Sequence, residues 1–306
     1  MSVPTHIITV MSNTSAQPDL SGLQTVLTEA SAKIIDISQL PVPVSVGTDR
    51  HIYMVTIRTN EGELLSPALM NLADNLRIDL VCQTLEQRQT DYGLAAFDMD
   101  STLICCEVID ELAKAAGVGD QVAAITLRAM NGDLNFDESF KARIAMLRGL
   151  SSEIVEDILE HIPIQEGLRE MTTTMRARGL RLAILSGGFL PFAKRLQVEY
   201  GFDYIVSNHL DIADGLLTGR VVPPIVNNEF KAKTLIRLAK NLGIPLSSCI
   251  AVGDGANDLA MIELAGLGVA FHAKSAVQAA APHRINHIGL DGLCYLIGDE
   301  FEATSG

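Results

Sequence analysis

Along the first 90 residues, segments in which apolar and polar positions alternate are separated by segments whose apolar residues have helical spacing. Strict alternation predicts half-buried strands, and helical spacing predicts amphipathic helices. In chain order, the predicted elements are strand His6–Met11, helix Leu20–Ala30, strands Lys33–Leu40 and His51–Thr59, helix Leu65–Arg77 and strand Ile78–Leu85. This βαββαβ order predicts a compact α+β domain over residues 1–90, with both helices on one face of its sheet. The polar stretch Glu86–Tyr92 is interpreted as a linker.

From Gly93 onward the pattern changes to short apolar runs separated by longer amphipathic segments. Short uninterrupted apolar runs are typical of strands that are buried on both faces of a parallel sheet. The predicted strands are Leu94–Phe97, Leu180–Leu185, Tyr204–Ser207, Cys249–Val252 and Gly268–Phe271. We therefore predict a second domain, residues 91–306, of the α/β class with a doubly wound parallel sheet. A helix-rich insertion at about 107–162 interrupts it and would form a cap above the carboxyl ends of the strands.

Charge and hydropathy argue against two kinds of partner and against a membrane-spanning helix. The chain has 306 residues and a formal net charge of −14, from 23 Lys and Arg against 37 Asp and Glu. Binders of nucleic acid or of anionic membranes need a basic surface, so we expect neither partner. The sequence also lacks a run of about 18 apolar residues, so no membrane-spanning helix is expected.

The cysteines indicate a reduced protein. Their number is odd and no CxxC pair occurs, which argues against a disulfide framework. The five are Cys82, Cys105, Cys106, Cys249 and Cys294. We expect them to be small buried apolar residues of a cytoplasmic protein. The N-terminal sequence MSVPTHIITV lacks the basic residues and the long apolar stretch of a signal peptide, which favours the same location.

Two pairs of aspartates follow predicted strands. Asp98 and Asp100 lie in FDMDST, directly after the first strand of the second domain, and Asp254 and Asp258 lie in GDGAND, after the strand Cys249–Val252. Alone, each motif is also typical of a polar turn or a helix cap. Like charges this close need a compensating cation or a shared proton. Because all the ligands would be oxygens, the four carboxylates together predict a site for Mg²⁺ rather than zinc.

A glycine-rich turn and a lysine supply what a phosphoryl group needs. Ser186 and Gly187, in the SGG sequence after the strand Leu180–Leu185, offer a hydroxyl and free backbone N–H groups. Lys231, near the start of the predicted helix Glu229–Leu242, offers a positive charge. Alone, each signal is weak, because glycine-rich turns are common and a helical lysine is usually solvated.

Taken in order, DMDST, SGG, Lys231 and GDGAND resemble the four motifs of the haloacid dehalogenase superfamily of phosphotransferases. The resemblance implies that Asp98 is the nucleophile, that it forms an aspartyl-phosphate, and that Asp100 is the general acid and base. It implies Mg²⁺ bound by Asp98, by Asp254 and by the backbone carbonyl of Asp100. The remaining implied roles are phosphoryl binding by Ser186, Gly187 and Lys231, support near the metal by Asp258 and Asn257, and positioning of the nucleophile loop by Thr102.

The insertion narrows the resemblance further. CCEVIDELAKAAG contains Glu107, and MNGDLNFDESFKARIAMLRG contains Met130, Phe136 and Arg143; both closely resemble the phosphoserine phosphatases. This resemblance implies that Glu107 binds the substrate ammonium group and Arg143 its carboxylate, with Met130 and Phe136 closing an apolar lid. The first 90 residues more weakly resemble ACT-like amino-acid-sensing domains.

The function that follows by resemblance is Mg²⁺-dependent hydrolysis of phosphoserine to serine, the last step of serine biosynthesis. The same motifs would also serve a phosphotransferase with an alcohol acceptor such as homoserine. A third hypothesis is a sensor whose ACT-like domain binds an amino-acid effector. Related enzymes are often dimers, and the sequence leaves a homodimer open.

Overall fold

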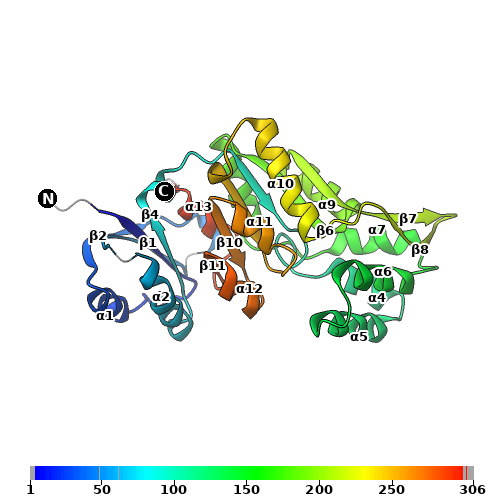
Figure 1. Cartoon of the computed structure of the whole chain (residues 1–306), viewed down its shortest axis with the longest axis horizontal. Coiled ribbons are helices and arrows are strands. Elements are labelled where there is room, and N and C mark those ends of the chain that lie inside the picture. The colour runs from blue at the N-terminus through cyan, green and yellow to red at the C-terminus, as the bar shows by residue number, and fades with distance from the viewer. Residues whose placement is uncertain (1–3, 48, 61, 299–300, 302–306) are drawn as a thin grey trace.

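A computed structural model describes residues 4–47, 49–60, 62–298 and 301. In these ranges the chain forms a four-stranded sheet of order β2-β3-β1-β4 and a seven-stranded sheet of order β11-β10-β9-β5-β6-β7-β8 (Figure 1). The predicted fold class is confirmed. The outermost residues of the two predicted domains, 1 and 306, lie outside the described residues, and the division near residue 90 stays a prediction.

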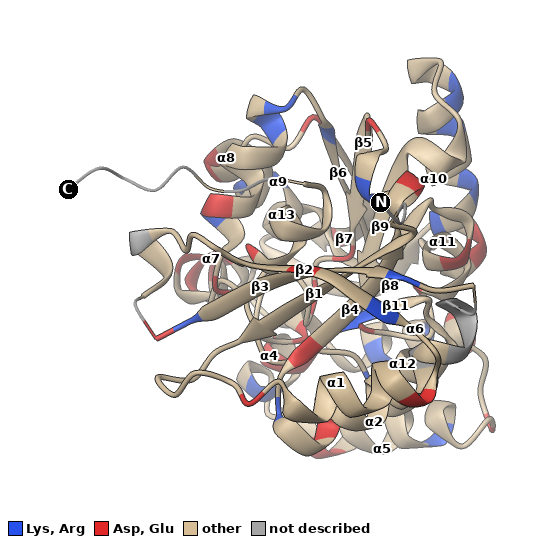
Figure 2. Cartoon of the chain, turned by 90° about the vertical axis from the view of Figure 1, so that its left-hand side faces the viewer, with Lys and Arg blue, Asp and Glu red and all other residues tan. Residues whose placement is uncertain are grey.

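The N-terminal sheet is antiparallel and carries two helices on one face (Figure 2). Its elements are β1 (His6–Ser12), α1 (Ser21–Glu29), β2 (Lys33–Leu40), η1 (Val44–Val46), β3 (His51–Arg58), α2 (Gly62–Leu76) and β4 (Asp79–Thr84). Ile8 and Val10 pack against Leu23 and Leu27 of α1, whereas Met11 faces the core of the second sheet. The alternation along β1 therefore contributes to two cores.

The predicted linker is partly wrong, because a short helix, α3 (Leu85–Gln89), occupies its first half. The Thr84 hydroxyl accepts a hydrogen bond from the Gln87 N–H at 3.1 Å, and the Gln87 side chain accepts one from the Thr84 N–H at 3.1 Å. This reciprocal capping starts a helix even in a polar segment. The TLEQ sequence carried that signal.

The seven-stranded sheet is parallel from β11 to β7 and ends in an antiparallel hairpin of β7 and β8. Its strands are β5 (Leu94–Phe97), β6 (Arg181–Phe189), β7 (Tyr204–Ala213), β8 (Leu216–Val222), β9 (Cys249–Gly253), β10 (Leu267–Phe271) and β11 (His283–Ile285). Beside them lie α8 (Leu168–Ala177), α9 (Leu190–Tyr200), α10 (Asn228–Leu242), η2 (Leu246–Ser248), α11 (Leu259–Leu264), α12 (Ser275–Ala280) and α13 (Gly292–Leu296). All of β5, the central strand, is buried, as its apolar sequence predicts.

The insertion after β5 is helical, as predicted. It contains α4 (Val108–Ala115), α5 (Gly119–Met130), α6 (Phe136–Met146) and α7 (Ser152–His161), at the opposite end of the molecule from the N-terminal sheet (Figure 1). The chain leaves and re-enters the core side by side. Ile104 forms an antiparallel bridge with Ile164, and the Cys105 N–H donates to the Pro163 carbonyl at 2.9 Å.

Buried polar contacts join the N-terminal sheet to the core. The Asp79 carboxylate accepts hydrogen bonds from three consecutive backbone N–H groups, those of residues 286–288, at 2.6–3.0 Å. The guanidinium of Arg50 forms ion pairs with Asp291 and, at 2.7 Å, with Glu166. These contacts connect residues that are more than a hundred positions apart in sequence.

The prediction for the cysteines holds in part. All five are free thiols, and Cys249 and Cys294 are buried. Cys82 and Cys106 are partly exposed, and Cys105 is exposed, so these three are not core residues. Across the part of the chain that the structure describes, no helix has the length and hydropathy needed to span a membrane.

Candidate active site

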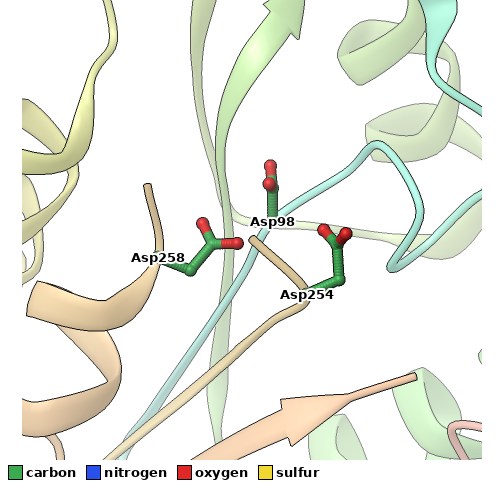
Figure 3. A group of neighbouring side chains, drawn as sticks. All are labelled: Asp98, Asp254 and Asp258. Carbon is green, nitrogen blue, oxygen red and sulfur yellow. The ribbon is translucent and has the colours of Figure 1, made fainter. Parts of the chain in front are cut away.

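Three carboxylates meet where β5 and β9 end. The Asp98 N–H donates to the Val252 carbonyl at 2.9 Å, which holds the two strand ends together. One ligand atom from each of Asp98, Asp254 and Asp258 lies within 4.8 Å of the others (Figure 3). The predicted convergence of the two aspartate motifs is therefore present in the structure.

Lys231 contacts this cluster from the first turn of α10, and its side chain has no exposed surface. Its ammonium group is 2.9 Å from an Asp98 oxygen and 2.6 Å from an Asp258 oxygen. Burial alone would lower the pKa of Lys231, but the carboxylates of Asp258 and Asp98 hold it above its usual range. The lysine is thus a fixed positive charge, unlike the solvated lysine that is usual on a helix.

Asp254 is buried and is repelled by the other carboxylates of the cluster. Burial, followed by repulsion from Asp258 and Asp98, raises the pKa of Asp254 to about 8. Both oxygens of Asp258 are already engaged, one by Lys231 and the other by the Gly255 N–H at 2.9 Å. The all-oxygen donor set of Asp98 and Asp254, next to a supporting Asp258, fits a hard divalent ion such as Mg²⁺.

Asp100, the second aspartate of the DMDST motif, lies in a buried and negatively charged environment. Burial, then the charges of Glu107 and Asp98, raise the pKa of Asp100 well above its ordinary value. One of its oxygens, Oδ1, is buried without a hydrogen-bond partner among the described residues. A Cβ placed on Gly188 would come within 2.8 Å of the other oxygen, so this glycine makes room for the carboxyl group. Gly188 was not among the predicted site residues.

The SGG segment, Ser186 to Gly188, was predicted as a turn after its strand, but it lies inside β6, where the pairing with β7 is irregular between Leu185 and Phe189. Hydrogen bonds hold this segment in place. The buried Ser186 hydroxyl accepts from the Gly188 N–H at 2.9 Å. Asn208 on β7 donates to the Gly187 carbonyl at 2.7 Å and accepts from the Val226 N–H at 2.9 Å. Asn208 therefore connects the SGG segment of β6 to the segment that leads into α10. No sequence motif marked Asn208, because its role depends on the neighbouring strand.

The beginning of the insertion brings Glu107 to the nucleophile loop. Glu107 precedes the first residue of α4 and accepts a hydrogen bond from the Ser101 hydroxyl at 2.8 Å. Ser101 itself has a φ of +56°, which is uncommon for a residue other than glycine. Thr102, the next residue, is buried, and its N–H donates to the Met99 carbonyl at 3.2 Å. This places Glu107 against the loop that carries both Asp98 and Asp100.

Arg143 lies on α6, within the electrostatic field of Glu107. Burial lowers the pKa of Arg143, and the carboxylates of Glu107, Asp110 and Asp100 oppose that shift. Its Nε is buried and has no hydrogen-bond partner in the described ranges. Such a group has unused donor capacity for an anionic ligand.

The two apolar residues predicted for the lid differ in position. A Cβ placed on Gly187 would be 3.3 Å from the Phe136 ring and 3.9 Å from the Asn257 amide nitrogen, so both side chains approach the SGG segment of β6. Phe136 also stacks on Phe140, with 6.1 Å between ring centroids. Met130, at the end of α5, is 70% exposed and is not brought to this group. Its role in a lid stays a prediction.

Comparison with known proteins places this geometry in a family. The profile of the haloacid dehalogenase-like hydrolases matches residues 95–263. The phosphoserine phosphatase of Archaeoglobus fulgidus is 40% identical over 245 residues, which are 80% of this chain and 71% of that protein. That of Saccharomyces cerevisiae is 35% identical over 275 residues, which are 89% of this chain and 88% of that protein.

A solved structure resembles nearly the whole chain. It is a haloacid dehalogenase family hydrolase from Salmonella enterica serovar Typhi, with a TM-score of 0.84 and 32% sequence identity. The alignment covers 97% of this chain and 99% of that one, so the N-terminal sheet is included. The chain therefore belongs to the haloacid dehalogenase-like hydrolases and, within them, to the phosphoserine phosphatases.

Proposed function

We propose that this protein hydrolyses L-phosphoserine to L-serine and phosphate through an aspartyl-phosphate, with Mg²⁺ as its cofactor. The observation that carries the proposal is the placement of Asp98 and Lys231 at one sheet edge, with Glu107 and Arg143 of the insertion beside them. The relatives in Archaeoglobus fulgidus and Saccharomyces cerevisiae bear the name phosphoserine phosphatase. In metabolism the reaction would be the last step of serine biosynthesis, in the cytoplasm.

Asp98 is the nucleophile of the proposed reaction. One of its carboxylate oxygens attacks phosphorus, the bond from phosphorus to the serine oxygen breaks, and an aspartyl-phosphate forms. The Lys231 ammonium group, 2.9 Å from Asp98, neutralises negative charge on the phosphoryl group as it transfers. The Ser186 hydroxyl and the Gly187 N–H hold the phosphoryl oxygens.

Asp100 moves the protons. Its raised pKa keeps a proton available for the departing serine oxygen, which becomes the serine hydroxyl. In the second half-reaction the same carboxylate, now ionised, takes a proton from the water that attacks phosphorus. Phosphate leaves, Asp98 is regenerated, and Asp100 is again protonated.

Asp98, Asp254 and the backbone carbonyl of Asp100 would hold Mg²⁺, with Asp258 and Asn257 as support. Bound there, the ion would offset the negative charges of the phosphoryl group and of the two carboxylates. Asp258 keeps Lys231 in place through the 2.6 Å ion pair, so it acts through the lysine.

The insertion recognises the amino-acid part of the substrate. Glu107, fixed by the Ser101 hydroxyl, binds the ammonium group. Arg143, with a buried Nε that lacks a partner in the described part of the chain, binds the carboxylate. Phe136 covers the SGG segment and keeps water from the phosphoryl group.

The test is phosphate release from L-phosphoserine, phosphoethanolamine and p-nitrophenyl phosphate, each with Mg²⁺ and after EDTA. We expect the highest kcat/KM for phosphoserine and loss of turnover after EDTA that added Mg²⁺ restores. Activity on phosphoserine no better than on p-nitrophenyl phosphate would contradict the proposal. A parallel reaction with homoserine measures transfer to an alcohol, and phosphohomoserine as the main product would replace hydrolase by phosphotransferase.

A further inference from the structure

A hydrogen bond joins the insertion to the helix that carries Lys231. The Asn227 amide nitrogen donates to the Asp137 carboxylate at 3.0 Å, in a half-buried position. Asp137 lies in the first turn of α6, and Asn227 immediately precedes α10. The bond therefore connects an element of the insertion with one of the core, ninety residues apart in sequence.

Asn227 is already committed to the geometry of Lys231. Its side-chain oxygen accepts from the Phe230 N–H at 3.0 Å, which caps α10, and its carbonyl accepts from the Lys231 N–H at 2.9 Å. Because one amide oxygen caps the helix, the amide NH₂ group remains available to Asp137. Asn227 thus holds the catalytic lysine's helix and the insertion with different atoms of one side chain.

The insertion side of this contact is equally well fixed. Asn135 caps α6 by accepting from the Glu138 N–H at 2.9 Å, and Glu138 accepts from the Asn135 N–H at 3.0 Å. This capping box orders the first turn of α6. Phe136 in that turn approaches Gly187, and Asp137 bonds to Asn227. Two consecutive residues of α6 therefore contact the two core segments that would hold the phosphoryl group.

We propose that the Asp137–Asn227 hydrogen bond is a latch that holds the insertion closed over the substrate, which makes Asp137 and Asn227 positioning residues. The inference rests on the proposed function, since a closed insertion matters through Phe136 and Arg143. Closure that follows substrate binding contributes to apparent affinity, so losing the latch raises KM more than it lowers kcat.

The test compares Asp137→Ala with Asp133→Ala, which removes an exposed carboxylate from the same insertion. We expect Asp137→Ala to lower kcat/KM for phosphoserine about three- to tenfold, mostly through KM, as expected for one net hydrogen bond. Asp137→Asn keeps an oxygen acceptor for the Asn227 amide and should stay within about twofold of the wild type. Amide hydrogen exchange in α6 should be faster in Asp137→Ala than in either comparison protein.

Asn227→Ser keeps a capping oxygen for α10 but cannot reach Asp137, so the two latch variants form a double-mutant cycle. We expect the double variant to be no worse than either single variant. Equal kcat/KM for Asp137→Ala and Asp133→Ala, or additive losses in the cycle, would overturn the latch. If the wild-type protein fails to hydrolyse phosphoserine, the proposed function fails, and the exchange of α6 alone then decides whether the latch exists.

Discussion

At the scale of single residues, the two aspartates of the DMDST motif lie in different surroundings. Asp98 lies 2.9 Å from the Lys231 ammonium group and accepts a hydrogen bond from the Met99 N–H at 2.7 Å. Asp100 is buried beside like charges, which favours its protonated form. In the proposed function, these different surroundings give the roles of nucleophile and acid to two chemically identical groups.

The first prediction concerns Asp100→Asn. We expect turnover of phosphoserine to fall by about two to four orders of magnitude, because the serine oxygen leaves without a proton and water is not deprotonated. With p-nitrophenyl phosphate, whose leaving group needs no proton, the variant should still release a rapid burst of nitrophenolate equal to the enzyme concentration. Rapid-mixing absorbance measures the burst. A variant without a burst but with a normally folded core would contradict this division of roles.

The same group sets the pH dependence. Because the pKa of Asp100 is raised, its proton is present below that pKa and is lost as the pH rises through it. We therefore expect kcat/KM for phosphoserine to fall on the alkaline side of its profile. For p-nitrophenyl phosphate, whose leaving group needs no proton, the alkaline fall in kcat/KM should be weaker.

Residues in contiguous motifs could be predicted from the sequence, and residues that act through space could not. Asp98, Asp254, Asp258 and Lys231 meet as their motifs imply. Asn208 was missed because its two hydrogen-bond partners are on other segments, and nothing in its local sequence indicates them.

At the scale of secondary-structure elements, α6 carries several of the residues to which the proposed function gives a role. Its first turn faces the core, and Arg143 follows about two turns later, near the other end. The capping box fixes the helix start, so a change in its tilt would move all these side chains together.

The second prediction tests whether Arg143 on α6 recognises the substrate carboxylate. Arg143→Ala should raise KM for phosphoserine at least tenfold, since a charged hydrogen-bond partner of the carboxylate is lost. KM for phosphoethanolamine, which has the ammonium group but no carboxylate, should change by less than about threefold. Steady-state kinetics on both substrates provide the comparison. Equal losses on the two would contradict carboxylate recognition by Arg143.

Elements with a strong hydrophobic pattern could be predicted from the sequence. Elements that depend on pairing with other strands could not. β5 matches its prediction at both ends because all its side chains are buried. β8 and β11 were missed: β11 has three residues, and β8 pairs antiparallel with an extension of β7 that continues beyond the buried core. Neither has the apolar run by which the other strands were found.

At the scale of the whole molecule, the N-terminal sheet is joined to the core by polar groups that are buried and paired. Asp79 satisfies three backbone N–H groups, and Arg50, with a side chain only 1% exposed, pairs with Asp291, which is fully buried. Because each group was placed by residues far away in sequence, neither pairing could be predicted from local pattern.

The third prediction concerns the stability of this junction. Arg50→Met should lower the free energy of unfolding by about 3–5 kcal/mol, because it leaves Asp291 as an uncompensated buried charge. Lys233→Ala is the control, since Lys233 forms an exposed ion pair with Glu229 and its loss should cost less than about 1 kcal/mol. Urea denaturation measures both. Equal effects would mean that Arg50 is not a structural link.

The adjacent exit and re-entry of the insertion has an evolutionary consequence. Ile104 and Ile164 are paired, and the Gln165 N–H donates to the Leu103 carbonyl at 3.0 Å, so the core is closed beneath the insertion. A segment of different length or shape could be exchanged between these two points without stretching the sheet. In the proposed function the phosphoryl chemistry belongs to the strands and recognition of the leaving group to the insertion, so the insertion could be replaced as one unit. One catalytic scaffold can in this way diversify its substrates by recombination, without rebuilding its reaction centre.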